Sequence, residues 1–229
     1  MSTLPPAAIL ADIEGTTTPS SFMRDVLAPF ARARLAAWMA RADTAPELAE
    51  ICRLAHGQKP LEAAFHWLDV GAKVTPLQTL QARIWQQGYQ DGTLKGALYP
   101  DVAPCLRRWA RAGLRLYTYS SGPVAAQKQL FAHTHEGDLT SLFAGFFDTR
   151  VGGKREPDSY GRLAIGMNVP TVEVLFLSDV EEELDAASVA GMRTCQLVRP
   201  EEDTLATDRH EVATDFPGVA ERIGMPRGA

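Results

Sequence analysis

The chain has 229 residues, and 45% of them are hydrophobic, which predicts a globular protein with a sizeable buried core. Its net charge of -5, without a run of lysines and arginines, argues against nucleic-acid binding, and no apolar stretch is long enough to span a membrane. Three cysteines without metal-ligand spacing favour free thiols, so we expect a cytoplasmic protein. We also expect a monomer that acts on a small molecule and binds neither nucleic acid nor a membrane.

The first predicted element is a buried strand over residues 7–13, which leads into two acids, Asp12 and Glu14. Residues i and i+2 of a strand point to the same face, so both carboxylates are expected to reach one substrate. A glycine and three threonines follow directly. An isolated acid in such a place often only caps nearby amides, and this is the alternative interpretation of each acid taken alone.

A long interval separates the first strand from the second, and four amphipathic helices are predicted within it, over residues 21–40, 45–55, 60–71 and 75–89. A crossover between parallel strands needs only one helix. The sequence therefore predicts an inserted helical unit, residues 20–99, between two parts of a core domain, residues 1–19 and 100–229. Ligands bind at the carboxyl ends of the strands in open α/β sheets, so we expect the insert to act as a lid.

Helices and strands alternate after the insert. The pattern predicts helices over residues 101–113, 123–134, 158–167 and 181–192, and strands over residues 114–120, 174–179 and 195–199. Nearly continuous apolar strands are typical of a parallel sheet that is covered on both faces. The fold class predicted is α/β, with a doubly wound, mostly parallel sheet.

Polar side chains follow each of the inner strands. The second strand ends on Ser120 and Ser121, the third on Asp179, and Lys154 lies in the loop "VGGKREPDSY". Carboxylates, hydroxyl groups and a lysine together suit a hard cation such as Mg²⁺ and a phosphate group. One carboxylate can attack phosphorus while the other moves protons. Taken singly, the two serines are equally explained as ordinary turn residues.

The motifs "DIEGTTTP", "YTYSSG", "FDTRVGGKREPDSY" and "LFLSDVEEE", in this order, resemble those of the haloacid dehalogenase-like phosphatase superfamily. Most phosphatases of the superfamily have aspartate at the second acid of the first motif, where this chain has Glu14. With that difference the chain is similar to the enolase-phosphatases of methionine salvage, also called acireductone synthases. The resemblance covers about residues 9–200 and implies a Rossmann-like core with an inserted α-helical cap.

The resemblance implies a Mg²⁺-dependent, bifunctional reaction. The substrate 2,3-diketo-5-methylthiopentyl 1-phosphate would first be enolised and then dephosphorylated to the acireductone, 1,2-dihydroxy-3-keto-5-methylthiopentene. Asp12 would be the nucleophile and a metal ligand, Glu14 the general acid/base with its carbonyl on the metal, and Asp179 the third ligand. The remaining site residues implied by the resemblance are Ser120, Ser121 and Lys154 for the substrate and its phosphate, with Glu183 in a supporting role.

Two other functions are compatible with the same motifs. One is a phosphatase or phosphomutase for a sugar phosphate, against which Glu14 argues. The other is a non-catalytic protein that uses the fold for binding, which would be expected to lose its nucleophile or its metal-binding acids. This chain has all of them.

Overall fold

The computed structural model describes residues 5–72 and 74–224, and the chain divides into two compact units. Met1–Ser20 and Gly96–Ala229 form one, called the core unit here, and Ser21–Lys95 form the other, called the helical unit. The sequence placed these boundaries at residues 19/20 and 99/100.

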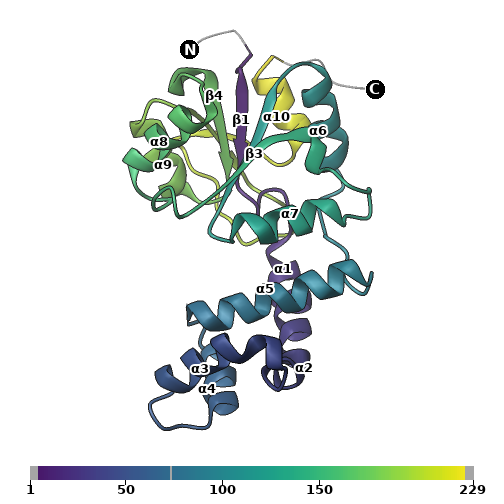
Figure 1. Ribbon diagram of the computed structural model, residues 1–229. Coiled ribbons are helices and arrows are strands. Elements are labelled where there is room, and N and C mark those ends of the chain that lie inside the picture. The colour runs from purple at the N-terminus through teal and green to yellow at the C-terminus, as the bar shows by residue number, and fades with distance from the viewer. Residues whose placement is uncertain (1–4, 73, 225–229) are drawn as a thin grey trace. The chain divides into compact units, whose positions relative to one another are not determined.

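A parallel six-stranded sheet forms the centre of the described part of the core unit (Figure 1). In spatial order its strands are β3 (Phe143–Asp148), β2 (Arg115–Ser120), β1 (Ala8–Ala11), β4 (Val174–Ser178), β5 (Arg193–Leu197) and β6 (Glu211–Ala213). All pairings between these strands are parallel. The chain moves outward from β1 in both directions, so the predicted doubly wound α/β fold is confirmed.

Helices cover both faces of this sheet (Figure 1). They are α6 (Val102–Arg111), α7 (Val124–Ala132), α8 (Pro157–Met167), α9 (Glu181–Val189) and α10 (Phe216–Arg222). Leu10, Tyr117 and Phe176 pack in one cluster with side chains of α8 and α9. On the opposite face, Thr118 of β2 donates to Gln127 of α7 at 2.6 Å. The alternation of strand residues between these two covered faces explains why β1 and β4 are buried throughout.

Two strands, β3 and β6, were not predicted. In β3 the run is interrupted by Gly145, a residue that weakens a strand. A Cβ at this position would lie 3.2 Å from the Tyr117 ring, so the aromatic packing favours a glycine there. The other missed strand, β6, has only three residues and lies at the sheet edge. Both misses therefore concern edge strands, which need no continuous apolar pattern.

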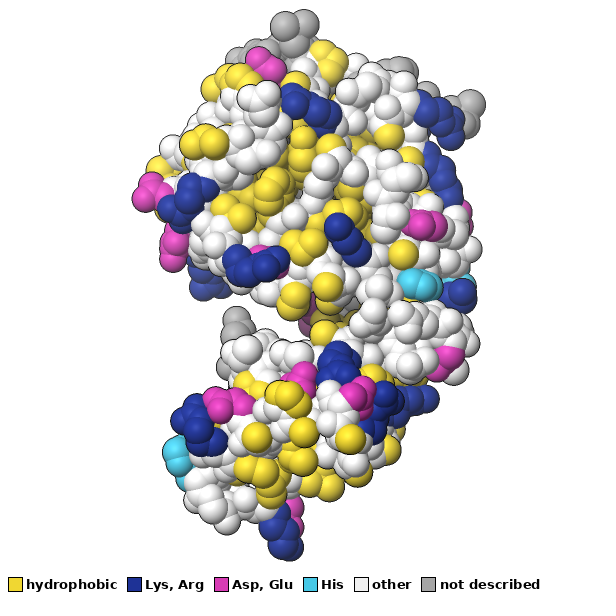
Figure 2. Space-filling model, in the orientation of Figure 1, with side chains coloured by type: hydrophobic (Ala, Val, Ile, Leu, Met, Phe, Trp, Pro, Cys, Tyr) yellow, Lys and Arg dark blue, Asp and Glu magenta, His cyan; other side chains and the backbone are white. Residues whose placement is uncertain are grey.

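The exposed side of β3 carries apolar side chains. Hydrophobic side chains gather on the face of the core unit that Figure 2 shows, where Figure 1 places β3. Phe143 and Phe146 are half-buried, Ala144 is exposed, and Nζ of Lys128 lies 5.8 Å from the centre of the Phe146 ring. A lysine near an edge strand discourages pairing with another chain.

The helical unit has its own hydrophobic core, which includes Leu35, Ile51, Leu80 and Ile84, all fully buried. Its helices are α2 (Ala28–Met39), α3 (Ala45–Leu54), α4 (Pro60–Asp69) and α5 (Thr75–Gln90), and the short α1 (Ser20–Phe22) precedes them. The four predicted helices are thus confirmed, and the lid function stays a prediction. Within the described residues, no helix combines the length and the apolarity needed to cross a membrane.

The first helix of this unit contains one irregularity. Met23–Leu27 form a π-helical turn, in which Ala28 N–H donates to the Met23 carbonyl five residues earlier. Pro29 follows and has no N–H to donate to the carbonyl of Asp25. The wider turn before the proline accommodates this missing hydrogen bond.

Trp109 of α6 lies in the packing between α6 and α10, so substitutions of this residue test that packing. Its ring is fully buried and stacks on Phe216 with ring centres 5.0 Å apart, but Nε1 has no acceptor among the described residues. We expect Trp109→Ala to lower the free energy of unfolding by about 3–5 kcal/mol. Trp109→Phe should lower the free energy of unfolding much less, because this substitution keeps an aromatic ring and removes the unpaired N–H. Urea unfolding measures both, and equal losses would contradict this description of the packing.

Candidate active site

The first strand ends one residue before Asp12. Asp12 N–H still donates to the Leu177 carbonyl of β4 at 2.8 Å, but the Ile13 carbonyl then accepts from the amides of Thr16–Thr18 and closes a turn. Asp12 therefore follows the strand, and Glu14 lies inside the turn. The prediction that both acids share a strand face was wrong, because the turn begins between them.

Gly15 allows this turn to pack directly against Asp179. Its φ is +71°, and a Cβ at this position would lie 2.4 Å from Oδ2 of Asp179. Both the backbone conformation and the available space therefore require glycine. Next to it, the Thr16 hydroxyl donates to Oδ1 of Asp179 at 3.4 Å. No role was predicted for Gly15 or Thr16, although the "GTTT" run after the acids marks the turn.

The strand register brings the predicted groups to one edge of the sheet. Ala11 of β1 pairs with Thr118 of β2 and with Leu177 of β4. Ser120 and Asp179 each lie two residues beyond those partners, so they lie at the same end of the sheet as Asp12. This edge is where open α/β sheets bind ligands.

Lys154 bridges two carboxylates at this edge. Its Nζ lies 2.7 Å from Oδ1 of Asp12 and 2.7 Å from Oε2 of Glu183. The side chains of Lys154, Asp12 and Glu183 are only 11%, 6% and 10% exposed. Ser178 Oγ donates to the same Glu183 oxygen at 3.0 Å. The structure therefore joins the predicted nucleophile, the loop lysine and the supporting acid in one buried chain of polar contacts.

Two core tyrosines position the loop that carries Lys154. Tyr119 of β2 donates its hydroxyl to the Gly152 carbonyl at 2.7 Å, and Tyr160 of α8 donates to the Lys154 carbonyl at 2.6 Å. Their rings pack edge to face with centres 5.7 Å apart. Because both rings belong to the hydrophobic core, these two hydrogen bonds tie the lysine loop to that core.

The charges of the site shift the pKa values of its members. Burial opposes the charge on Lys154, but Asp12 and Glu183 outweigh it and hold the lysine pKa above its usual value. Burial and then the Asp12 charge raise the pKa of Asp179 to about 6 and that of Glu183 to about 7. The pKa of Glu14 is raised by the same two causes. Lys154 thus compensates only part of the negative charge, which favours binding of a cation.

The residues present fit a magnesium ion. Asp12 and Asp179 supply carboxylates and Glu14 a carbonyl, so all predicted ligands are oxygen atoms. Among residues 5–72 and 74–224, no group of three or more His, Cys, Asp or Glu could hold a metal by itself. A two-carboxylate set agrees with the preference of Mg²⁺, which keeps several waters and binds substrate phosphate as well.

The two serines lie at the same edge without touching this polar chain. Ser120 is half-buried, and its Oγ accepts the Gly122 N–H at 3.2 Å, while Ser121 is exposed. In the part of the chain that the structure describes, neither side chain bonds to Asp12 or Lys154. Their predicted contact with substrate therefore stays a prediction based on their place after β2.

Comparison with known proteins gives consistent results. The haloacid dehalogenase-like hydrolase family matches residues 6–191. The "Enolase-phosphatase E1" of Gluconacetobacter diazotrophicus is 48% identical over 97% of this chain and 96% of its own length. The protein of that name from Granulibacter bethesdensis is 49% identical over 97% of this chain and 98% of its own.

Two solved structures share the fold. The UTR4 protein of Saccharomyces cerevisiae superposes with a TM-score of 0.79 at 29% identity, over 92% of this chain and 98% of that one. CbbY from Rhodobacter sphaeroides, solved in complex with phosphate, has a TM-score of 0.63 at 19% identity, over 92% of this chain and 95% of that one. The second likeness concerns the fold alone.

The raised pKa of Asp179 predicts a gain in stability when its charge is removed. A carboxyl group with a raised folded-state pKa favours folding while it is protonated, and this benefit is lost as the pH rises from about 4 to about 6. At pH 8, metal-free Asp179→Asn should therefore be more stable than the parent by roughly 1–3 kcal/mol.

Urea unfolding in the presence of a chelator measures this difference. Asp138→Asn is the matched control, because bonds from Thr140 hold the pKa of Asp138 below its usual value. That control should show no gain at pH 8. A metal-free Asp179→Asn protein that is less stable than the parent at pH 8 would contradict the electrostatic description.

Proposed function

Since this chain belongs to the enolase-phosphatase E1 family of the haloacid dehalogenase-like hydrolases, we propose that one site at the edge of its sheet performs both reactions of that name. The enzyme converts 2,3-diketo-5-methylthiopentyl 1-phosphate to the acireductone and phosphate, a step of methionine salvage. The observation that carries the mechanism is the bridge of Lys154 between Asp12 and Glu183.

Asp12 is the nucleophile of the phosphatase reaction. Its Oδ1 is held by Lys154 and by the Ile13 N–H, at 2.7 Å each, and the described residues place no donor on Oδ2. Attack by this second oxygen on phosphorus forms an aspartyl-phosphate and breaks the bond to the substrate oxygen. The ammonium group reduces the repulsion between the carboxylate and the phosphate dianion, so the attack becomes possible. Water then attacks phosphorus and releases Asp12.

Glu14 fits the proton transfers of both reactions. Glu14 is accessible at the surface, as contact with a substrate requires, while the protein around it removes part of its hydration. Its raised pKa favours the protonated form nearer to neutral pH. In the enolisation, a carboxylate takes the proton from the carbon that bears the phosphate ester. The electron pair of the broken C–H bond forms the new C=C bond, and the neighbouring carbonyl oxygen takes a proton from water. The same group, now protonated, can donate that proton to the oxygen that leaves phosphorus. One acid thereby serves both steps.

Magnesium is the proposed cofactor. Asp12, Asp179 and the Glu14 carbonyl would hold it, and a bound Mg²⁺ supplies charge compensation for the phosphate and polarises a substrate oxygen. Ser120 and Ser121 would bind phosphate or substrate oxygens. Burial and then the Asp12 charge raise the pKa of Asp179, and the negative charge that these two acids bring together supports this assignment.

We further propose that the enzyme is a cytoplasmic monomer whose partner is its small phosphorylated substrate. The state of the three cysteines supports a reducing compartment, because all are free thiols. Cys105 and Cys195 are buried, and Cys52 is exposed.

The substrate assignment is tested by incubating the protein with the diketo phosphate under anaerobic conditions, with and without Mg²⁺. We expect enol absorbance and free phosphate to appear together and only with the metal. Phosphate release from sugar phosphates, without turnover of the diketo phosphate, would overturn the substrate and favour a sugar-phosphate phosphatase.

Glu14→Gln separates the roles of the two acids. Because the amide cannot exchange the proton, phosphate release in a single turnover should slow at least about 10²-fold. Glu136→Gln is the control and should keep the rate of the parent, since this exposed acid pairs with Arg107 at 3.2 Å and lies outside the site. Unchanged single-turnover kinetics of Glu14→Gln would contradict the acid/base role.

A further inference from the structure

Arg199 is a buried arginine that follows β5 and takes no part in the reaction described above. It is only 2% exposed. Its Nε and Nη2 donate to the Thr16 carbonyl at 3.2 and 2.7 Å. Thr16 belongs to the turn that follows Asp12. The arginine therefore holds the main chain of the catalytic turn from a point 183 residues away in sequence.

Asp101 and two aromatic rings fix the guanidinium group. Nη1 of Arg199 lies 2.9 Å from both carboxylate oxygens of Asp101, and Oδ2 of Asp101 also accepts the Phe216 N–H at 2.8 Å. The Arg199 guanidinium lies 4.1 Å from the centre of the Tyr99 ring and 5.3 Å from that of Phe216. A planar, forked donor suits these partners, and a lysine cannot reproduce them.

Core filling alone does not explain this ion pair. Burying two charges is costly, and well-packed apolar side chains often stabilise a core as well or better. Here two nitrogens of Arg199 are directed at a single carbonyl of the catalytic turn, which an apolar side chain would leave without a donor. The arrangement therefore favours a role in placing that turn.

The turn also contacts one of the proposed reacting groups, the Asp179 carboxylate. The Thr16 hydroxyl donates to Asp179, and Gly15 packs against the same carboxylate. The neighbouring Thr17 carbonyl accepts the Tyr99 N–H at 3.1 Å. A displacement of this segment would change the separation of Asp179 and Asp12, between which the proposed metal and phosphate bind.

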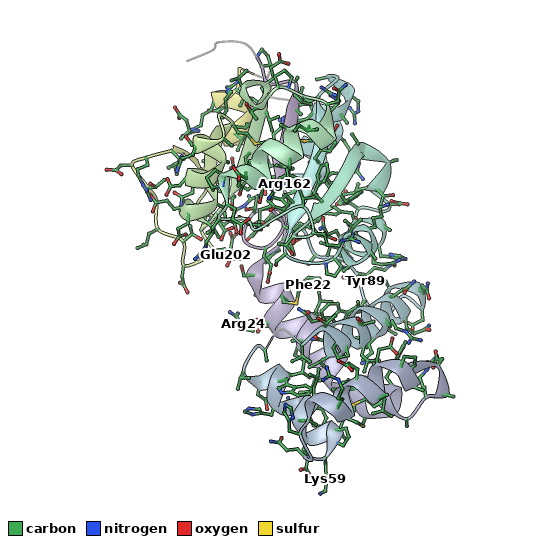
Figure 3. All side chains as sticks on the ribbon, turned by 60° about the vertical axis from the view of Figure 1, so that its left-hand side comes forward. Phe22, Arg24, Lys59, Tyr89, Arg162 and Glu202 are labelled. Carbon is green, nitrogen blue, oxygen red and sulfur yellow. The ribbon has the colours of Figure 1, made fainter. Side chains whose placement is uncertain are left out.

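The end of the same segment is also held from the region after β5. Oε1 of Glu202 accepts the Tyr99 hydroxyl at 2.5 Å and the Ser20 N–H at 2.9 Å, and Figure 3 labels this residue on the core unit. Ser20 is the last residue of the core unit before the helical insert. Arg199 and Glu202 thus hold the catalytic segment at Thr16 and at Ser20.

We propose that Arg199 is a positioning residue for phosphoryl transfer, which fixes the Thr16 carbonyl and thereby sets the catalytic turn against Asp179. This inference rests on the proposed function. Misplacing reacting groups by about 1 Å can cost about 10²-fold in rate. Loss of the arginine should therefore lower kcat and leave KM nearly unchanged.

Two variants test the proposal. Arg199→Lys keeps the charge and loses the fork. The double variant Arg199→Met, Asp101→Asn removes both charges together, and its asparagine can still accept the Phe216 N–H. For each variant that folds, we expect kcat to fall about 10²-fold with KM within about twofold of the parent. Circular dichroism and urea unfolding give the folded fraction, to which kcat is referred.

Arg115→Lys is the matched control. Nη1 of Arg115 also donates to main-chain carbonyls, those of Met167 and Asn168 at 3.2 and 3.4 Å, but at the start of β2. The carboxyl edge of the sheet is at the other end of that strand. We expect this variant to keep the kcat of the parent.

The outcomes distinguish this inference from the proposed function. A folded Arg199 variant with the kcat of the parent would overturn the positioning role, and so would an equal loss in Arg115→Lys. If the parent itself fails to turn over the diketo phosphate, the proposed function fails. The kcat of each variant relative to that of the parent, measured on a simple phosphate monoester, then still decides the role of Arg199.

Discussion

The bridge that Lys154 makes between Asp12 and Glu183 is the interaction on which the site depends. An unpaired charge buried to this extent would strongly oppose folding, and a lysine 2.7 Å from each carboxylate offsets that cost. The compensation is incomplete, since the Asp12 charge still contributes to the raised pKa values of Asp179 and Glu183. A folded site with this excess of negative charge favours a cation, in agreement with the proposed binding of Mg²⁺ and a phosphate.

The groups proposed as catalytic lie on loops, but buried polar contacts make those loops part of the core. Tyr119 and Tyr160 hold the lysine loop by its carbonyls, and Arg199 holds the turn after Asp12 in the same way. Main-chain carbonyls are suitable anchors because they fix the backbone and leave the reacting side chains free. Pre-organisation of this kind reduces the rearrangement needed to reach the transition state.

The sequence was sufficient to predict the elements that alternate regularly and the groups at their ends. Asp12, Asp179 and Lys154 could be found because parallel strands and motif order bring them to one edge. The turn between Asp12 and Glu14 was missed, because an apolar Ile13 continues the strand pattern while its carbonyl closes a turn. Arg199 could not be found from sequence, since its partner Thr16 lies 183 residues away and contributes only a carbonyl.

In the proposed mechanism, Asp12 accepts the phosphoryl group while Lys154 holds the phosphate and the nucleophile together. Rapid acid quenching of the enzyme during turnover of substrate with a radiolabelled phosphate tests this most directly. We expect a hydroxylamine-sensitive label on the peptide that contains Asp12, and neither label nor phosphate release in a folded Asp12→Asn protein. Label on another residue, or near-normal turnover by Asp12→Asn, would contradict the account.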